Sequence, residues 1–127
     1  MPQRRFEGLH NQFVASAKAV KLAHEIDPDN MVGCMIAGSA NYPYSCNPDD
    51  VLAALESDRI FNFYCGDMHV RGAYPAWSAD YWAKNGVDVA RMQELYARDA
   101  EVLKAGTVDF YSFSYYQSNT VSVDPEM

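Results

Sequence analysis

Only two segments of this sequence have the pattern of a β-strand, and helical sequence separates them. Residues 31–37 form a short, almost continuously apolar run, and residues 108–116 are rich in aromatic side chains. The first pattern favours a strand buried on both faces. The stretch between the two is long enough to be the crossover that joins parallel strands. Two parallel strands are too few for a stable sheet. We therefore predict an α/β chain that is one piece of a larger domain, with open strand edges.

The helices expected around these strands follow from apolar spacing and capping residues. Leu9, Phe13 and Ala17 share one face of a helix over residues 9–26, which ends before Pro28. Asn47 can cap a second helix, which has Pro48 at its first position and Asp49 and Asp50 in its first turn. The apolar pattern allows this helix to continue through residues 60–63. Two further helices are predicted at these ranges: residues 75–84 and 88–104. Two loops are predicted at residues 38–46 and 117–127.

Composition limits the classes of function. The chain of 127 residues fits one domain, residues 1–127, and its net charge of −7 weighs against binding a nucleic-acid backbone. No apolar run is long enough to span a membrane, and no secretory signal is visible at the N-terminus. The three cysteines, Cys34, Cys46 and Cys65, have no paired spacing, so we expect free thiols in a cytoplasmic protein.

Several stretches together resemble one family of enzymes. Residues 107–116, Thr-Val-Asp-Phe-Tyr-Ser-Phe-Ser-Tyr-Tyr, are similar to the sixth barrel strand of family 1 glycoside hydrolases, and most of all to the bacterial 6-phospho-β-glucosidases. Residues 32–37, Val-Gly-Cys-Met-Ile-Ala, resemble the fifth strand of that family. Other matching stretches are residues 9–17, 46–54 and 71–75. The resemblance implies a partial (β/α)₈ barrel, with about two parallel strands and surrounding helices.

The resemblance also implies a reaction. Members of the family are retaining glycosidases, which use one carboxylic acid and one nucleophilic carboxylate about 5 Å apart. The family's Asn-Glu-Pro and Glu-Asn-Gly motifs do not occur in this sequence, and Lys84-Asn85-Gly86 has a lysine where the nucleophile would stand. We therefore expect a fragment of an enzyme that hydrolyses phosphorylated β-glucosides. The fragment should be inactive alone and prone to self-association.

Ser114 and Tyr116 are the candidate site residues. They are two positions apart in the second strand, so they should share a face near its C-terminal end, where barrel active sites lie. The resemblance implies that Tyr116 hydrogen-bonds the nucleophilic carboxylate and that Ser114 lies near the sugar. Phe113 and Tyr115 should face the other way and pack on helices. Asn41, Tyr42 and Tyr44 follow the first strand and could lie near the barrel mouth.

Other features have simpler explanations. Asp49 and Asp50 fit a helix start. His10 and His24 have no third ligand at a suitable spacing, so no metal site is expected. No cofactor is expected either. Trp77, Tyr81 and Trp82 could stack on a sugar, but their helical spacing is more typical of core residues. Two alternatives remain open: a free-standing, non-catalytic α/β module that binds a sugar or another subunit, and a fragment of a β-glucosidase that acts on unphosphorylated sugars.

Overall fold

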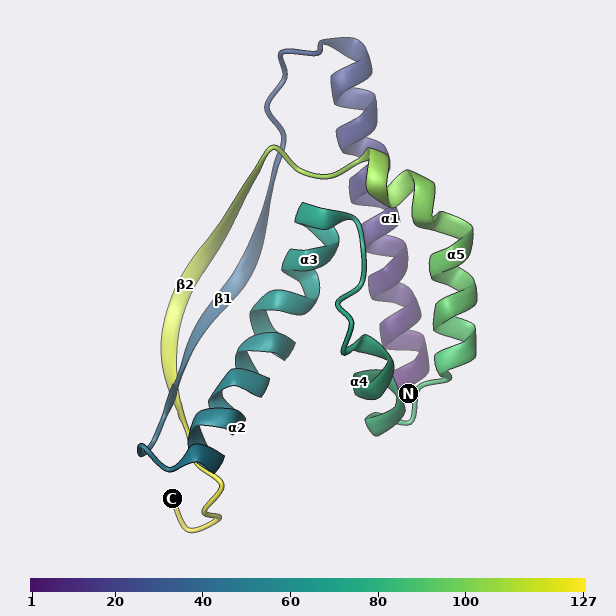
Figure 1. Ribbon diagram of the computed structural model, residues 1–127. Coiled ribbons are helices and arrows are strands. Elements are labelled where there is room, and N and C mark those ends of the chain that lie inside the picture. Colours follow the sequence, from purple (N-terminus) through teal and green to yellow (C-terminus); the bar gives the residue numbers. More distant parts are fainter.

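The computed structural model describes all residues from Met1 to Met127, and it places the helices on one side of a two-stranded sheet (Figure 1). Strand β1 (Gly33–Pro43) and strand β2 (Phe110–Val121) pair in parallel, as predicted. The helical elements are listed here in chain order: α1 (Pro2–Ile26), α2 (Pro48–Asp58), the π-helical turn η1 (Arg59–Phe63), α3 (Tyr64–Arg71), α4 (Ser78–Lys84) and α5 (Val89–Ala105). None of these helices combines the length and the apolar character needed to cross a membrane.

Both strands are longer than their apolar sequences predict. β1 ends at Pro43 and β2 at Val121, so residues 38–43 and 117–121 are strand and the two predicted loops are wrong there. The pairing runs from Gly33 opposite Phe110 to Pro43 opposite Val121. Each extension supplies backbone hydrogen-bonding partners for the other. The polar ends of the two strands therefore pair with each other, although neither has a strand-like composition.

The helix predictions are confirmed in type and corrected in extent. α1 begins at Pro2, seven residues before the predicted start at Leu9, because proline is well accommodated in a first helical turn. Asn47 caps α2 by accepting from the backbone N–H of Asp49 at 3.0 Å. Asp88 caps α5 by accepting from the N–H of Arg91 at 3.1 Å. The helix that starts at Pro48 continues through η1 and α3 to Arg71.

The apolar core lies among the helices rather than against the sheet. One buried cluster joins α1, α3 and α5 through these residues: Phe13, Val14, Ala17, Tyr64, Met68 and Leu103. A second cluster contains Trp82, Val87, Met92 and Leu95. The Trp82 indole N–H donates to the Tyr64 hydroxyl at 3.0 Å, which links the two clusters. No apolar side chain of β1 or β2 belongs to the buried core.

The sheet is therefore not covered on both faces, contrary to the sequence prediction for residues 31–37. Met35, in the middle of β1, is 71% exposed because every helix packs on the opposite side. The strands have the composition of a buried sheet, but this chain supplies cover for only one face. The uncovered face is where the candidate site residues lie.

Candidate functional site

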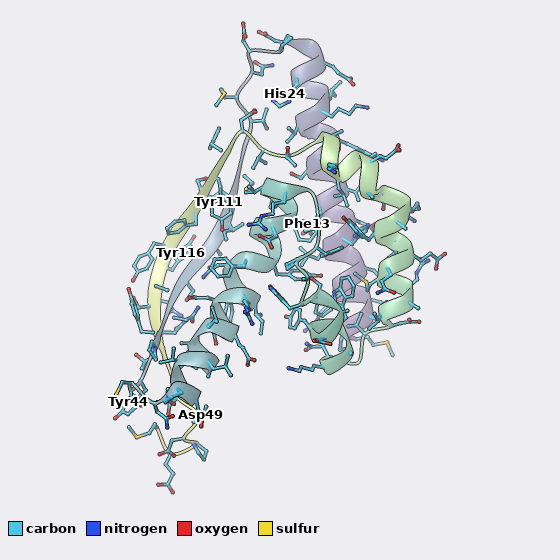
Figure 2. The ribbon with its side chains drawn as sticks, in the orientation of Figure 1. Phe13, His24, Tyr44, Asp49, Tyr111 and Tyr116 are labelled. Carbon is cyan, nitrogen blue, oxygen red and sulfur yellow. The ribbon has the colours of Figure 1, made fainter.

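The uncovered side of the sheet, here called the helix-free face, is formed by Met35, Ala37, Ser114 and Tyr116. Ala37 lies opposite Ser114 in the pairing register, and the Ser114 hydroxyl donates to the Met35 sulfur at 3.1 Å. Figure 2 shows Tyr116 pointing from β2 away from the helices, and its side chain is 78% exposed. Ser114 and Tyr116 thus lie on one open face, although the role predicted for them needs groups outside this chain.

Tyr116 occupies an irregular position in β2. Gly38 pairs with Tyr115, whereas the next residue, Ser39, pairs with Gln117, so Tyr116 is the extra residue of a β-bulge. Bulges redirect side chains and are frequent beside active sites. The predicted position near the strand end needs correction, because β2 continues to Val121 and places Ser114 and Tyr116 in its middle.

The opposite face of β2 turns toward the helices, as the alternation of the sequence predicts. Tyr111, Phe113 and Tyr115 line a cavity of about 360 Å³ together with Asn62 and Phe63 of η1. Phe113 and Tyr115 nevertheless remain largely exposed, so they face the helices without being the core residues that the sequence predicts. Burial raises the pKa of Tyr111, which keeps this phenol neutral.

A polar network lies beside Tyr116. The Asn119 amide donates to the Ser39 hydroxyl at 2.6 Å and to the Asn41 side-chain oxygen at 3.2 Å. The Asn41 amide in turn donates to Asp58 at 2.9 Å. Ser39, Asn41, Tyr116 and Asn119 line a common open hollow of about 540 Å³. Asn41 was expected near the barrel mouth from its position alone, whereas Asn119 was missed because its segment had no strand signal.

One side chain of η1 occupies the free edge of β1. Asn62 accepts from the Ser39 backbone N–H at 3.2 Å and donates to the Ser39 carbonyl at 2.7 Å. These two backbone groups are those that a neighbouring strand would bind. Asn62 therefore satisfies the hydrogen bonds of the β1 edge at Ser39, which is also a member of the polar network.

The acidic pair at the start of α2 has a structural role. Asp50 is buried and accepts from the Ser45 hydroxyl at 2.6 Å and from the Val123 N–H at 2.9 Å. The hydrogen bond from Ser45 and the one from Val123 hold the pKa of Asp50 below its usual range. Asp50 thus connects the start of α2 to the segment after β2. The sequence pattern explains Asp50 only as a residue of a helix start and does not predict this connection. Figure 2 shows both Asp49 and Tyr44 at this end of the sheet.

The two helical histidines are engaged by single carboxylates. His10 is fully buried, and its ring nitrogens contact the Tyr74 hydroxyl at 2.8 Å and Asp99 at 2.9 Å. His24 contacts Asp109 at 2.7 Å. No group of three or more His, Cys, Asp or Glu side chains is placed to hold a metal ion. Both histidines serve to join α1 to later parts of the chain.

The groups on the helix-free face can position a ligand but cannot perform glycosidic cleavage. Ser114 and Tyr116 on this face, and Asn119 in the adjoining hollow, offer hydroxyl and amide groups, which bind sugar hydroxyls or a carboxylate. Retaining cleavage needs two carboxyl groups about 5 Å apart across the bond that breaks. Those two carboxyl groups are not among the residues of this face.

Comparison with known proteins shows which proteins this chain is similar to. Residues 2–127 match the model of glycosyl hydrolase family 1. The 6-phospho-β-glucosidase AscB of Escherichia coli is 49% identical over 96% of this chain and 24% of its own length. The aryl-phospho-β-D-glucosidase BglH of Bacillus subtilis is 46% identical over 95% of this chain and 25% of its own length.

A solved structure agrees with these relatives. The family 1 β-glucosidase of Thermotoga maritima superposes with a TM-score of 0.71 and 26% identity, covering 91% of this chain and 25% of that one. The chain thus spans about a quarter of the length of the proteins it matches. The likeness confirms the predicted fold class, an α/β part of a (β/α)₈ barrel.

Proposed function

Because the chain belongs to glycosyl hydrolase family 1, we propose that it provides the fifth and sixth strands of a barrel that hydrolyses 6-phospho-β-glucosides. In this proposal β1 and β2 are neighbouring barrel strands, and α1 to α5 belong to the outer helical layer. The helix-free face then lines the interior of the barrel, where the substrate binds near the carboxyl ends of the strands.

The observation that carries the proposal is the difference between two kinds of relative. Identity with the E. coli phospho-glucosidase is 49%, whereas identity with the Thermotoga β-glucosidase is 26% over a similar part of the chain. This difference favours a phosphorylated substrate over the alternative of an unphosphorylated one. The match over nearly the whole chain also favours part of an enzyme over a free-standing binding module.

Ser114 and Tyr116 have different roles in the proposed enzyme. The Tyr116 hydroxyl donates to the carboxylate nucleophile and keeps it ionised, since a hydrogen bond to the charged form favours that form. Ser114 lies near the sugar and binds it through its hydroxyl. Both are positioning residues, and the acid/base and the nucleophile come from other parts of the barrel.

The proposal includes a cytoplasmic location. The three cysteines are all free, which suits a reducing compartment. Phosphorylated sugars are charged and do not cross membranes by themselves, so an enzyme acting on them would meet its substrate inside the cell.

A pair of chimeric enzymes tests the proposal. This chain replaces the corresponding quarter of the E. coli relative in one chimera and of the Thermotoga β-glucosidase in the other. Each chimera is assayed with the nitrophenyl glucoside that its host cleaves, with or without the 6-phosphate. We expect the phospho-glucosidase chimera to retain kcat/KM within about tenfold of its host, because the grafted strands carry matching side chains.

The controls separate the parts of the proposal. The chain by itself should show no turnover of either glucoside, since the catalytic carboxyl groups are absent from it. If the Thermotoga chimera retains an equal or larger fraction of its host's activity than the phospho-glucosidase chimera does, the assignment to phosphorylated substrates is contradicted. Loss of both activities in soluble, folded chimeras would contradict the assignment to these two strands.

A further inference from the structure

A second cavity lies in the helical layer, apart from both faces of the sheet. It has a volume of about 400 Å³ and opens between the end of α2 with η1 and the short helix α4. Two of its lining residues, Trp77 and Tyr81, are aromatic. The volume falls in the range of pockets that hold small organic ligands.

The aromatic wall of this cavity is fixed before any ligand binds. The rings of Trp77 and Tyr81 are 5.9 Å apart with an interplanar angle of 64°. The ring centroid of Tyr64, a core residue, lies 6.1 Å from that of Trp77, and the centroid of Phe6 in α1 lies 5.4 Å from that of Tyr81. Trp77 and Tyr81 are half-buried, so one side of each packs on the core and the other lines the cavity. A rigid aromatic wall binds a ligand at little cost in conformational entropy.

The rim of the cavity carries four charged side chains that have no bonded partner in the chain. Arg59 and Lys84 provide two cations, and Glu56 and Asp80 provide two carboxylates. None of these four side chains forms an ion pair or a hydrogen bond within the chain. Their charges cancel, so the cavity has no preference for an anion such as a phosphate ester. It offers both hydrogen-bond donors and acceptors around an apolar wall.

We propose that this cavity is a second carbohydrate site, which binds a neutral pyranose ring against Trp77 and Tyr81. A pyranose has apolar C–H faces that pack on aromatic rings and equatorial hydroxyls that both donate and accept. The charged side chains meet these hydroxyls with charge-assisted hydrogen bonds. The site lies outside the sheet, so it is independent of the phosphorylated substrate proposed for the helix-free face.

The two tryptophans of the chain provide a direct test. Trp77 lines the cavity, whereas Trp82 is buried with its indole N–H bound to Tyr64. The purified chain, labelled with ¹⁵N at tryptophan, is titrated with methyl β-D-glucopyranoside and followed by NMR. We expect the Trp77 indole signal to shift saturably and the Trp82 signal to stay in place. Glucose 6-phosphate should bind no more tightly than the neutral glucoside, because the two cations and the two carboxylates of the rim leave no net attraction for its charge.

Matched variants decide the outcome. Trp77→Ala should abolish binding of the glucoside, and Glu56→Ala should raise its Kd about tenfold, as expected for one hydrogen bond to a charged group. Glu101→Ala removes an exposed carboxylate from α5, far from the cavity in sequence, and should leave the Kd unchanged. If Trp77→Ala loses helical structure, Glu56→Ala decides alone.

Three results would overturn the proposal. The first is an unmoved Trp77 signal at tens of millimolar glucoside. The second is an equal shift of both indole signals, which indicates a general solvent effect. The third is an equal Kd for Glu56→Ala and Glu101→Ala. None of these results bears on the chimeric enzymes, whose activity depends on the helix-free face.

Discussion

Tyr116 combines an accessible hydroxyl with a backbone position set by a bulge. Its side chain is 78% exposed, and its hydroxyl has no hydrogen-bond partner within the chain. Its neighbour Tyr115 turns the other way, and the Tyr115 hydroxyl contacts Ser118. The two adjacent tyrosines therefore differ in what their hydroxyls can reach, which makes them a matched pair for mutation.

Removing the Tyr116 hydroxyl should impair catalysis without disturbing the fold. In the phospho-glucosidase chimera we expect Tyr116→Phe to lower kcat by about tenfold or more, through loss of a donor that stabilises charge at the reacting centre. The lost donor also raises the pKa of the nucleophile, so the acidic limb of the pH–rate profile should move to higher pH. Tyr115→Phe is the control and should change neither. An unshifted limb with Tyr116→Phe would contradict the role proposed for this hydroxyl.

The sequence could place Ser114 and Tyr116 because alternation in a strand is a local property. Residues two apart in an extended chain share a face, and this needs no knowledge of the partner strand. Asn119 could not be found in that way. It reaches Ser39 and Asn41 only because the bulge at Tyr116 changes the pairing and the strand continues past it. A bulge is a product of tertiary pairing and leaves no reliable signal in the sequence.

Among the elements, the helices were easier to predict than the strand ends. Asn47 and Asp88 cap their helices through local hydrogen bonds, so the cap predicted at Asn47 and the helix predicted to start at residue 88 could both be found from nearby sequence. The ends of β1 and β2 depend on each other, because residues 38–43 pair with residues 115–121 across a long separation in sequence. The polar ends of the strands therefore follow from the pairing and not from β-propensity.

The start of the sheet is tied to α1 by one carboxylate. Asp109 accepts from the Val32 backbone N–H at 2.8 Å and contacts His24 at 2.7 Å. The bond from Val32, followed by the contact with His24, lowers the pKa of Asp109. Because the pKa of Asp109 is lower in the folded chain than in the unfolded chain, its ionised carboxylate stabilises the fold at pH values above the unfolded pKa. This stabilisation is lost as the pH falls through the folded pKa.

Replacement of Asp109 should therefore give a pH-dependent loss of stability. We expect Asp109→Asn to lower the melting temperature, followed by circular dichroism, at neutral pH. The difference from the unmodified chain should shrink as the pH falls below about 4. Asp29→Asn is the control, because the Asp29 side chain forms no hydrogen bond or ion pair, although its backbone N–H donates to Asp27. A difference in melting temperature that is the same at all pH values would show that the charge of Asp109 does not contribute to the stability of this contact.

Two glycines with the same backbone conformation differ in their surroundings. Gly72 ends α3 with φ of 67°, and a Cβ there would lie 2.6 Å from the Leu103 carbonyl oxygen. Gly86 has φ of 69°, and a Cβ there would meet nothing within 4 Å. We expect Gly86→Ala to cost about 1 kcal/mol, from conformation alone. Gly72→Ala should cost about 3 kcal/mol or more, because α5 must also move. Equal losses in urea unfolding would contradict close contact between α3 and α5.

At the scale of the whole molecule, the chain has a helical core and a sheet that needs more protein. The buried clusters join α1, α3, α4 and α5, whereas neither strand contributes an apolar residue to them. Asn62 satisfies part of the edge of β1, but no helix covers the helix-free face. The buried core of the chain therefore lies in its helices, and the uncovered sheet face is the part that other strands of the proposed barrel would complete.

The uncovered sheet should make the isolated chain associate. We expect its mean mass in sedimentation velocity to rise with concentration, because Met35, Phe113 and Tyr116 are exposed on strands with open edges. Met35→Lys places a charge on the helix-free face and should shift the distribution toward monomer. Met127→Lys adds the same charge to the C-terminal residue and should not. A monomer at every concentration would show that the helical layer alone keeps the chain soluble, and equal effects of the two lysines would mean that net charge controls association.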